Sequence, residues 1–358
     1  MFIGACGFGS TGSSVITDYL KEFDDVRVKD DLEFTWVSRT DGLIDLERAV
    51  MHPHNRTGDS ITAIRRFKVL AEKLERVYAV HGLPREEFRR LIDEYLESIT
   101  TVKWYWYSNS GKSVYTPKGL ASYLMRRKII PKAEIKRGHH VTWWPLREVS
   151  LSVKPENFYE ASRKLVQEML TAMGVDTSKT VALDQPFAGN NPQACFPFFD
   201  NPYAVVVDRD PRDNYVFART KLLGKFHYIP INSVEDYIAY YRALRKDQPY
   251  LEPNPRILNI RFEDMVYEYK KTSAKVREFL HLPENPRPRT VFEPNLSIAN
   301  TQVFKRFPQF AEDVRKIERE LPEYLFDFSK YPEPDFSKKM FYGKSPLHEG
   351  FKRLKQDM

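Results

Sequence analysis

Residues 1–20, MFIGACGFGSTGSSVITDYL, decide the fold, because an apolar run, a glycine-rich turn and a second apolar run follow one another without a gap. We expect a buried strand at residues 2–6, a tight turn at residues 7–14 and then a helix. The apolar side chains of that helix share one face: Val15, Ile16, Tyr19, Leu20 and Phe23. Glycines let the backbone approach an anion, and the free N–H groups of a first helical turn point at it. The stretch therefore predicts a site for a phosphate or sulfate ester.

The turn has the spacing of a Walker-type phosphate loop from Gly7 to Gly12 and Ser13. Ser13, however, stands where the lysine of a nucleoside triphosphatase would be. Transfer or hydrolysis of a triphosphate is therefore less favoured by this sequence. The alternative interpretation is a glycine-rich turn between strand and helix that binds nothing.

A second segment places two arginines directly after a predicted strand, as the first places its glycine-rich turn. Residues 204–207 (AVVV) are predicted to be a buried strand, and DRDPRDN follows at once, with Arg209 and Arg212. Ligands of open parallel sheets bind outside the carboxyl ends of the strands, and guanidinium groups suit a phosphate well. The alternative is an arginine–aspartate network on the surface.

The predicted strands are spread along nearly the whole chain, at residues 2–6, 26–29, 180–184, 204–207 and 256–260. This spread favours one α/β domain, residues 1–335, over two separate domains. Residues 45–175 are expected to form a large, mostly helical insertion, because apolar residues there recur at helical spacing. Residues 336–358 are expected to be a C-terminal extension.

Three segments in this order resemble sulfotransferases that use 3′-phosphoadenosine 5′-phosphosulfate (PAPS), and bacterial-type members most. Residues 9–14 (GSTGSS) are similar to the loop for the 5′-phosphosulfate, and residues 207–213 (VDRDPRD) to the 3′-phosphate motif. Residues 261–265 (RFEDM) resemble a segment after a later strand. The resemblance implies an α/β fold of the P-loop type, with a three-layer parallel sheet flanked by helices. It also implies direct in-line transfer of a sulfonate to a hydroxyl or amine of a carbohydrate or other small acceptor, leaving 3′-phosphoadenosine 5′-phosphate (PAP).

The same resemblance assigns the residues that would hold the cofactor. They are Gly9, Ser10, Thr11, Gly12, Ser13 and Ser14 at the 5′-phosphosulfate, Arg209 and Arg212 at the 3′-phosphate, and Lys305 and Arg306 beside a closing loop at residues 295–301. The sequence departs from the family at two places. Ser10 stands where many members have a lysine or arginine, and Phe217 where the 3′-phosphate motif has a serine. Lys112 is a candidate for the missing cation.

A catalytic base is also needed to take the proton of the acceptor. Glu33 is the leading candidate, with Asp31 beside it, because carboxylates follow the predicted strand at residues 26–29. The resemblance implies the same, since Golgi-type sulfotransferases have their catalytic glutamate at a similar distance beyond the phosphate loop. Histidine is the alternative base, as in cytosolic members. The candidates are His139, His140 and His227.

The acceptor site has two candidate segments. Residues 104–113 (WYWYSNSGKS) form an aromatic run that suits a wall against a sugar or a flat apolar group, and core packing is the alternative. Amides of residues 185–191 (QPFAGNN) are expected to bind acceptor hydroxyls.

The composition narrows the remaining function classes. A formal charge of +7 suits an anionic cofactor or an acidic glycan acceptor. The sequence has no zinc-finger or RNA-recognition signature, so we expect no nucleic acid partner. No ligand spacing for a metal is present, and no metal is expected. Two cysteines and no apolar run of membrane-spanning length favour a cytoplasmic protein. A P-loop kinase for a small molecule and a non-catalytic binding protein remain alternatives.

Overall fold

The computed structural model describes residues 1–55, 57–106, 147–221, 228–246, 253–338 and 340. Within these residues a five-stranded parallel sheet has the order β2-β5-β1-β6-β7. Its strands are β1 (Phe2–Gly7), β2 (Val26–Glu33), β5 (Thr180–Asp184), β6 (Pro202–Asp208) and β7 (Ile257–Arg261). All five predicted strands are confirmed. The predicted end of β2 is four residues too early, because residues 30–33, three of which are acidic, also belong to the strand.

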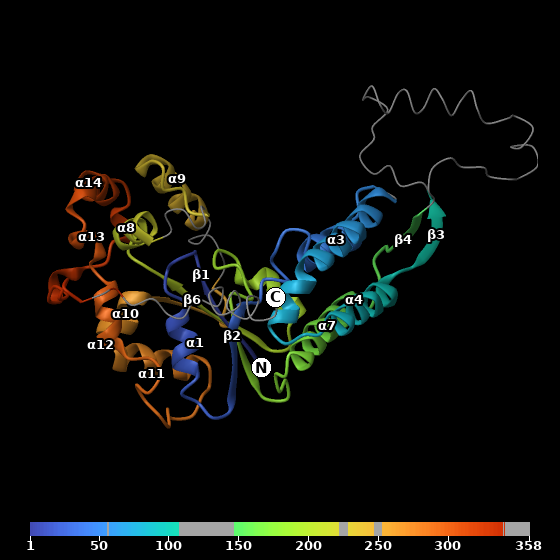
Figure 1. The fold of residues 1–358 in the computed structure, drawn as a ribbon, viewed down its shortest axis with the longest axis horizontal. Helices are drawn as coiled ribbons and strands as arrows, with labels where there is room; N and C mark the ends of the chain where they lie inside the picture. The colour runs from blue at the N-terminus through green and yellow to red at the C-terminus, as the bar shows by residue number, and fades with distance from the viewer. Residues whose placement is uncertain (56, 107–146, 222–227, 247–252, 339, 341–358) are drawn as a thin grey trace, which may run out of the picture.

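Helices cover both faces of the sheet, so the predicted three-layer α/β fold is confirmed (Figure 1). One face carries α1 (Ser14–Leu20), α10 (Phe262–Tyr267) and α11 (Tyr269–Phe279), and the other carries α2 (Leu43–Met51), α3 (Gly58–Val80), α4 (Arg85–Ile99) and α7 (Phe158–Ala172). Side chains of a strand alternate between faces. In β1, Ile3 and Ala5 therefore pack with α1, while Phe2 and Cys6 pack on the opposite face.

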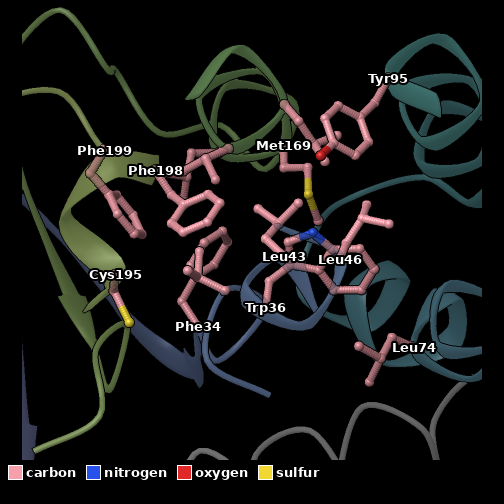
Figure 2. Packing of buried hydrophobic residues seen from close by; sticks show 14 of the residues in the cluster. Phe34, Trp36, Leu43, Leu46, Leu74, Tyr95, Met169, Cys195, Phe198 and Phe199 are labelled. Carbon is pink, nitrogen blue, oxygen red and sulfur yellow. The ribbon is translucent and has the colours of Figure 1, made fainter. Parts of the chain in front are cut away.

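The chain between β2 and β5 forms an arm. Helices α3, α4 and α7 lead away from the sheet to the antiparallel pair β3 (Val102–Trp106) and β4 (Arg147–Leu151), as Figure 1 shows. Figure 2 shows that one hydrophobic cluster runs from Phe199 and Cys195 beside the sheet, through Phe34, to Trp36 and Leu74 at the helices. The arm and the sheet thus share a core.

A further group of helices packs together around its own hydrophobic cluster beside the sheet (Figure 1). It comprises α8 (Pro211–Lys221), α9 (Val234–Arg245), α13 (Val303–Arg306) and α14 (Ala311–Glu320). The remaining short elements are α12 (Pro294–Ser297) and the 3₁₀ turns η1 (Pro192–Phe198), η3 (Ile298–Asn300), η4 (Pro308–Phe310), η5 (Pro322–Tyr324) and η6 (Phe328–Lys330). Among the helices that the structure describes, none has the length and apolar character needed to span a bilayer.

The sheet order creates a crevice at the end of β1. The chain leaves β1 toward β2 and β5 on one side and later returns to β6 and β7 on the other. Such a reversal opens a crevice at the carboxyl end of the central strand, where ligands of doubly wound sheets bind. The glycine-rich turn begins at this point, directly after β1.

Candidate functional site

The turn after β1 takes a backbone course that requires glycine. Gly9 and Gly12 both have φ of +88°, and Ser10 between them has φ of +53°. A Cβ on Gly12 would lie 2.6 Å from the ring of Phe262, and one on Gly9 would lie 2.8 Å from the ring of Tyr228. No residue that the structure describes accepts a hydrogen bond from the backbone N–H groups of residues 10–14. These donors are therefore available to an anion at the start of α1.

Two amide side chains hold the turn in place. Gln185 accepts a hydrogen bond from the Gly7 N–H at 3.2 Å and donates from Nε2 to Ser13 Oγ at 2.7 Å. Asn214 donates from Nδ2 to the backbone oxygens of Gly9 and Ser10, at 3.1 and 3.2 Å. The Ser13 hydroxyl keeps its own hydrogen for a ligand, since Oγ is the acceptor in this contact. The turn is thus pre-organised by the residue directly after β5 and by a residue of α8.

Arg209, directly after β6, is the second anion receptor. Its side chain lies between the rings of Phe217 and Phe262, with the guanidinium carbon 5.0 and 5.1 Å from the ring centres. The residue is only 3% exposed, and Nη2 donates to the backbone oxygen of Asn300. Its buried Nε has no hydrogen-bond partner among the residues that the structure describes. A desolvated cation with an unused donor favours an anionic ligand.

Two carboxyl groups are buried behind Arg209. Burial raises the pKa of Glu263 above its ordinary value, and burial, opposed by the Arg209 charge, raises the pKa of Asp213. Both shifts favour the neutral acid over the carboxylate. Asp210, the remaining acid here, pairs with Arg212 at 2.8 Å.

Both anion receptors face one cavity of about 340 Å³, which we call the loop cavity. Arg209 is the single cationic side chain among its described lining residues. The lining residues are Ser10, Gly12, Ser13, Ser14, Val15, Asp18, Glu33, Asp184, Gln185, Arg209, Phe217, Tyr228, Phe262, Val291, Phe292, Glu293, Leu296, Ser297 and Asn300. The volume lies at the small end of the usual range for ligand pockets.

The loop cavity is also lined by a pair of carboxyl groups, those of Glu33 and Asp184. Glu33 and Asp184 are register partners at the ends of β2 and β5, and a bulge between Lys29 and Glu33 brings them opposite each other. Burial, and then the Glu33 charge, raises the pKa of Asp184 to about 8. Loss of water at the cavity rim also raises the pKa of Glu33, and the Arg39 charge opposes this shift. Two acids with raised pKa values can accept and hold a proton beside the turn.

Sequence reasoning selected Glu33 but missed Asp184. The available signal was that Asp184 ends a predicted strand directly before the 185–191 loop. Asp31, the other predicted acid, lies outside the loop cavity. It accepts from Lys29 and lies 3.1 Å from His81 Nδ1, and these contacts lower its pKa to about 2.

The structure does not bring three of the predicted basic residues to the loop cavity. Arg212 is bound to Asp210 and to Glu318 and donates to the Phe326 oxygen, so its guanidinium is used within the protein. Lys305 pairs with Glu333 at 2.8 Å. Arg306 donates to the Lys338 oxygen. None of the three lines the cavity.

Other predicted site residues fall outside the described part of the chain. These are Lys112, His139, His140 and His227. Trp104 and Tyr105 of the aromatic run lie in β3, and Tyr105 is 67% exposed. Of the residues sequence reasoning overlooked, Tyr228 is the clearest, since its hydroxyl lies 2.8 Å from Ser10 Oγ. No local pattern marks it. Gln185, from the segment expected to bind acceptor hydroxyls, bonds Gly7 and Ser13 of the turn and lines the loop cavity.

No protein-family model and no curated protein matches the chain. Several solved structures are similar to it in fold. The sulfotransferase domain from the curacin biosynthetic pathway is 13% identical, with a TM-score of 0.38, over 91% of this chain and 98% of that one. Sulfotransferase STF9 from Mycobacterium avium is 10% identical, with a TM-score of 0.36, over 93% and 77%. Retinol dehydratase, in complex with androsterone and the inactive cofactor PAP, is 14% identical, with a TM-score of 0.30, over 99% and 80%. At these identities the likeness is one of fold and carries no residue-level correspondence.

Proposed function

We propose that the protein is a sulfotransferase that moves a sulfonate group from PAPS to a hydroxyl or amine of a carbohydrate or another small acceptor. The observation that carries this proposal is the buried Arg209, which lines the same cavity as the turn, where the N–H groups of residues 10–14 have no acceptor among the described residues. Two anion receptors in one cavity suit a nucleotide with phosphates at both its 3′ and 5′ positions.

The charge balance of the loop cavity favours a sulfonate over a triphosphate. A phosphosulfate carries less negative charge than a triphosphate. Enzymes usually neutralise the charge of a triphosphate with a lysine and Mg²⁺. Ser13 stands in the place of that lysine, and its Oγ is bound to Gln185. The N–H groups of the turn and the Ser13 hydroxyl can then stabilise the charge that spreads over the leaving phosphate.

In the proposed reaction, an acceptor oxygen or nitrogen attacks sulfur in line. The new bond to sulfur forms as the bond from sulfur to the 5′-phosphate oxygen breaks, and PAP leaves. Glu33 takes the acceptor proton, and Asp184 lies next to it across the two strands. The turn holds the 5′ end of the cofactor, and Arg209 holds the 3′-phosphate. No step is assigned to a metal ion.

The test is calorimetric titration with PAP beside ATP plus Mg²⁺. We expect PAP to bind in the micromolar range and ATP more weakly; tighter binding of ATP would favour a small-molecule kinase and contradict the proposal. Transfer of radioactive sulfonate from PAPS to a panel of sugars, phenols, amines and lipids would then identify the acceptor.

One observation favours a second candidate, a non-catalytic binding protein with the same fold. Ser10 occupies the place of a family cation and is bound to Tyr228 rather than left free for a leaving oxygen. Such a protein would bind PAP and transfer no sulfonate to any acceptor. The cytoplasmic location stays a prediction, as does the lack of a nucleic acid partner.

A further inference from the structure

A second cavity, larger than the loop cavity, lies apart from the phosphate turn. It has a volume of about 830 Å³, more than twice that of the loop cavity. Helices α1, α10 and α11 and the stretch at residues 285–295 surround it. The lining residues are Tyr19, Val266, Tyr267, Glu268, Tyr269, Lys270, Lys271, Ser273, Ala274, Arg277, Asn285, Pro288, Arg289, Pro294 and Asn295. We call this cavity the basic groove, after Lys270, Lys271, Arg277 and Arg289.

The basic groove carries an excess of positive charge. Its four cationic side chains face one carboxylate within the lining, that of Glu268. Lys270 and Lys271 are exposed, and the described part of the chain offers neither of them a carboxylate at ion-pair distance. Arg277 has only a long contact of 3.6 Å to Glu284, whose side chain is 93% exposed. Such a contact contributes little to stability.

The nearest buried acid does not balance this charge. Glu22 is fully buried beneath the 285–292 stretch. Its carboxylate accepts from the N–H groups of Val291 and Phe292, at 3.0 and 3.1 Å, and from Asn285 Nδ2 at 2.5 Å. These bonds use the Glu22 carboxylate to fix the wall of the groove. Arg289 is held by the Glu293 carboxylate, so Lys270 and Lys271, with the weakly paired Arg277, are the cations left to a partner from solution among the described residues.

We propose that the basic groove binds a small polyanion with two or more phosphate or sulfate groups. Lys270, Lys271 and Arg277 supply separate cationic donors, which suit several charged groups better than a single ion. The volume is in the range of ligand pockets, and far above what one inorganic ion needs. Tyr267 and Tyr269 give the groove an apolar wall for the body of the ligand.

This site is distinct from the loop cavity, and it does not depend on the proposed function. The two cavities share no described lining residue: within residues 288–300, Arg289 and Asn295 line one, and Leu296 and Asn300 line the other. A ligand of the groove therefore binds without Arg209.

The experiment is calorimetric titration of the full chain at low ionic strength with three probes: pyrophosphate, a trisulfated disaccharide and PAP. The double variant Lys270→Ala/Lys271→Ala is expected to weaken binding of at least one of the first two probes about tenfold or more. Lys275→Ala is the matched control, because Lys275 is exposed on the same helix and does not line the groove. Arg209→Ala tests the other cavity.

The probe that binds best identifies the source of the charged groups, a phosphate or a sulfated sugar. The proposal is overturned if neither pyrophosphate nor the disaccharide binds at millimolar concentration. It is equally overturned if Lys275→Ala weakens binding as much as the double variant, which would indicate unspecific attraction, or if only Arg209→Ala weakens it. Failure of PAP to bind the loop cavity would contradict the proposed function and leave this result unaffected. Thermal melting of the variants, whose altered lysines are exposed, confirms that they fold.

Discussion

Glu33 and Asp184 are register partners at the ends of β2 and β5, and their carboxyl groups line the same cavity. The strands bring two carboxyl groups together, with Asp184 half-buried and Glu33 exposed. The result is the raised pKa of Asp184, about 8. A group of this kind makes the stability of the fold depend on pH.

The direction in which Asp184 changes the stability of the fold with pH follows from the protons bound by the folded and unfolded states. Its pKa is about 8 in the folded state and about 3.9 in an unfolded chain, so the folded state binds more protons between these values. The Asp184 contribution to stability is therefore lost as pH rises from about 4 to 8. We expect Asp184→Asn to raise the melting temperature more at pH 8 than at pH 4.5. The exposed Asp93→Asn on α4 is the control, and an equal effect of both variants at both pH values would contradict the burial of Asp184.

The affinity for PAP should depend on Arg209. Arg209→Ala removes charged hydrogen bonds from the loop cavity, and we expect a loss of about 1.5–3 kcal/mol in binding free energy, or about tenfold to a hundredfold in Kd. Calorimetry with PAP measures it. Arg315→Ala, on the exposed face of α14, serves as the control for a lost positive charge. Unchanged affinity in the Arg209 variant would remove this residue from the site.

Arg212 should behave in the opposite way. Its guanidinium is bound to the fully buried Asp210, so Arg212→Ala leaves a carboxylate without its partner. We expect the free energy of unfolding to fall by about 3–5 kcal/mol. Urea denaturation measures this loss. A variant that keeps its stability and instead loses PAP affinity would assign Arg212 to the cofactor after all.

Gly12 should tolerate no side chain. In Gly12→Ala the new Cβ meets both an unfavourable φ of +88° and the ring of Phe262 at 2.6 Å. Gly174→Ala is a matched control, because its φ is +81° and no atom lies within 4 Å of the new Cβ. We expect Gly174→Ala to cost about 1 kcal/mol of stability from backbone strain alone. Gly12→Ala should cost more and also weaken PAP binding. Equal losses of stability in the two variants would show that Phe262 moves aside easily.

The sequence predicted the local parts of the site well. Residues 2–20 form a strand, a turn and a helix through neighbouring contacts, and their apolar spacing shows this directly. It was less informative about Arg209 and Arg212, which are three residues apart. The first directly follows β6 and lines the loop cavity, whereas the second lies in the first turn of α8 and is bound to Asp210.

Long-range contacts explain what sequence reasoning missed. Asp184 comes beside Glu33 only because β5 pairs with β2, which is more than 140 residues away in the chain, and because a bulge shifts the register. Tyr228 reaches Ser10 from a different group of helices. The predicted end of β2 is too early because three of residues 30–33 are acidic, and the strand is carried past them to the pairing of Glu33 with Asp184 of β5.

The wall between the two cavities also joins them. Arg289, in the lining of the basic groove, holds the carboxylate of Glu293, which lines the loop cavity and caps α12. An anion in the basic groove that drew Arg289 away from Glu293 would leave the Glu293 carboxylate without its cation. That carboxylate would then repel an anion in the loop cavity. The two sites would then be antagonists, and thermodynamic reciprocity requires each occupant to weaken the other by the same factor. The strength of the Arg289–Glu293 ion pair would then determine how strongly the ligand of one cavity weakens binding in the other.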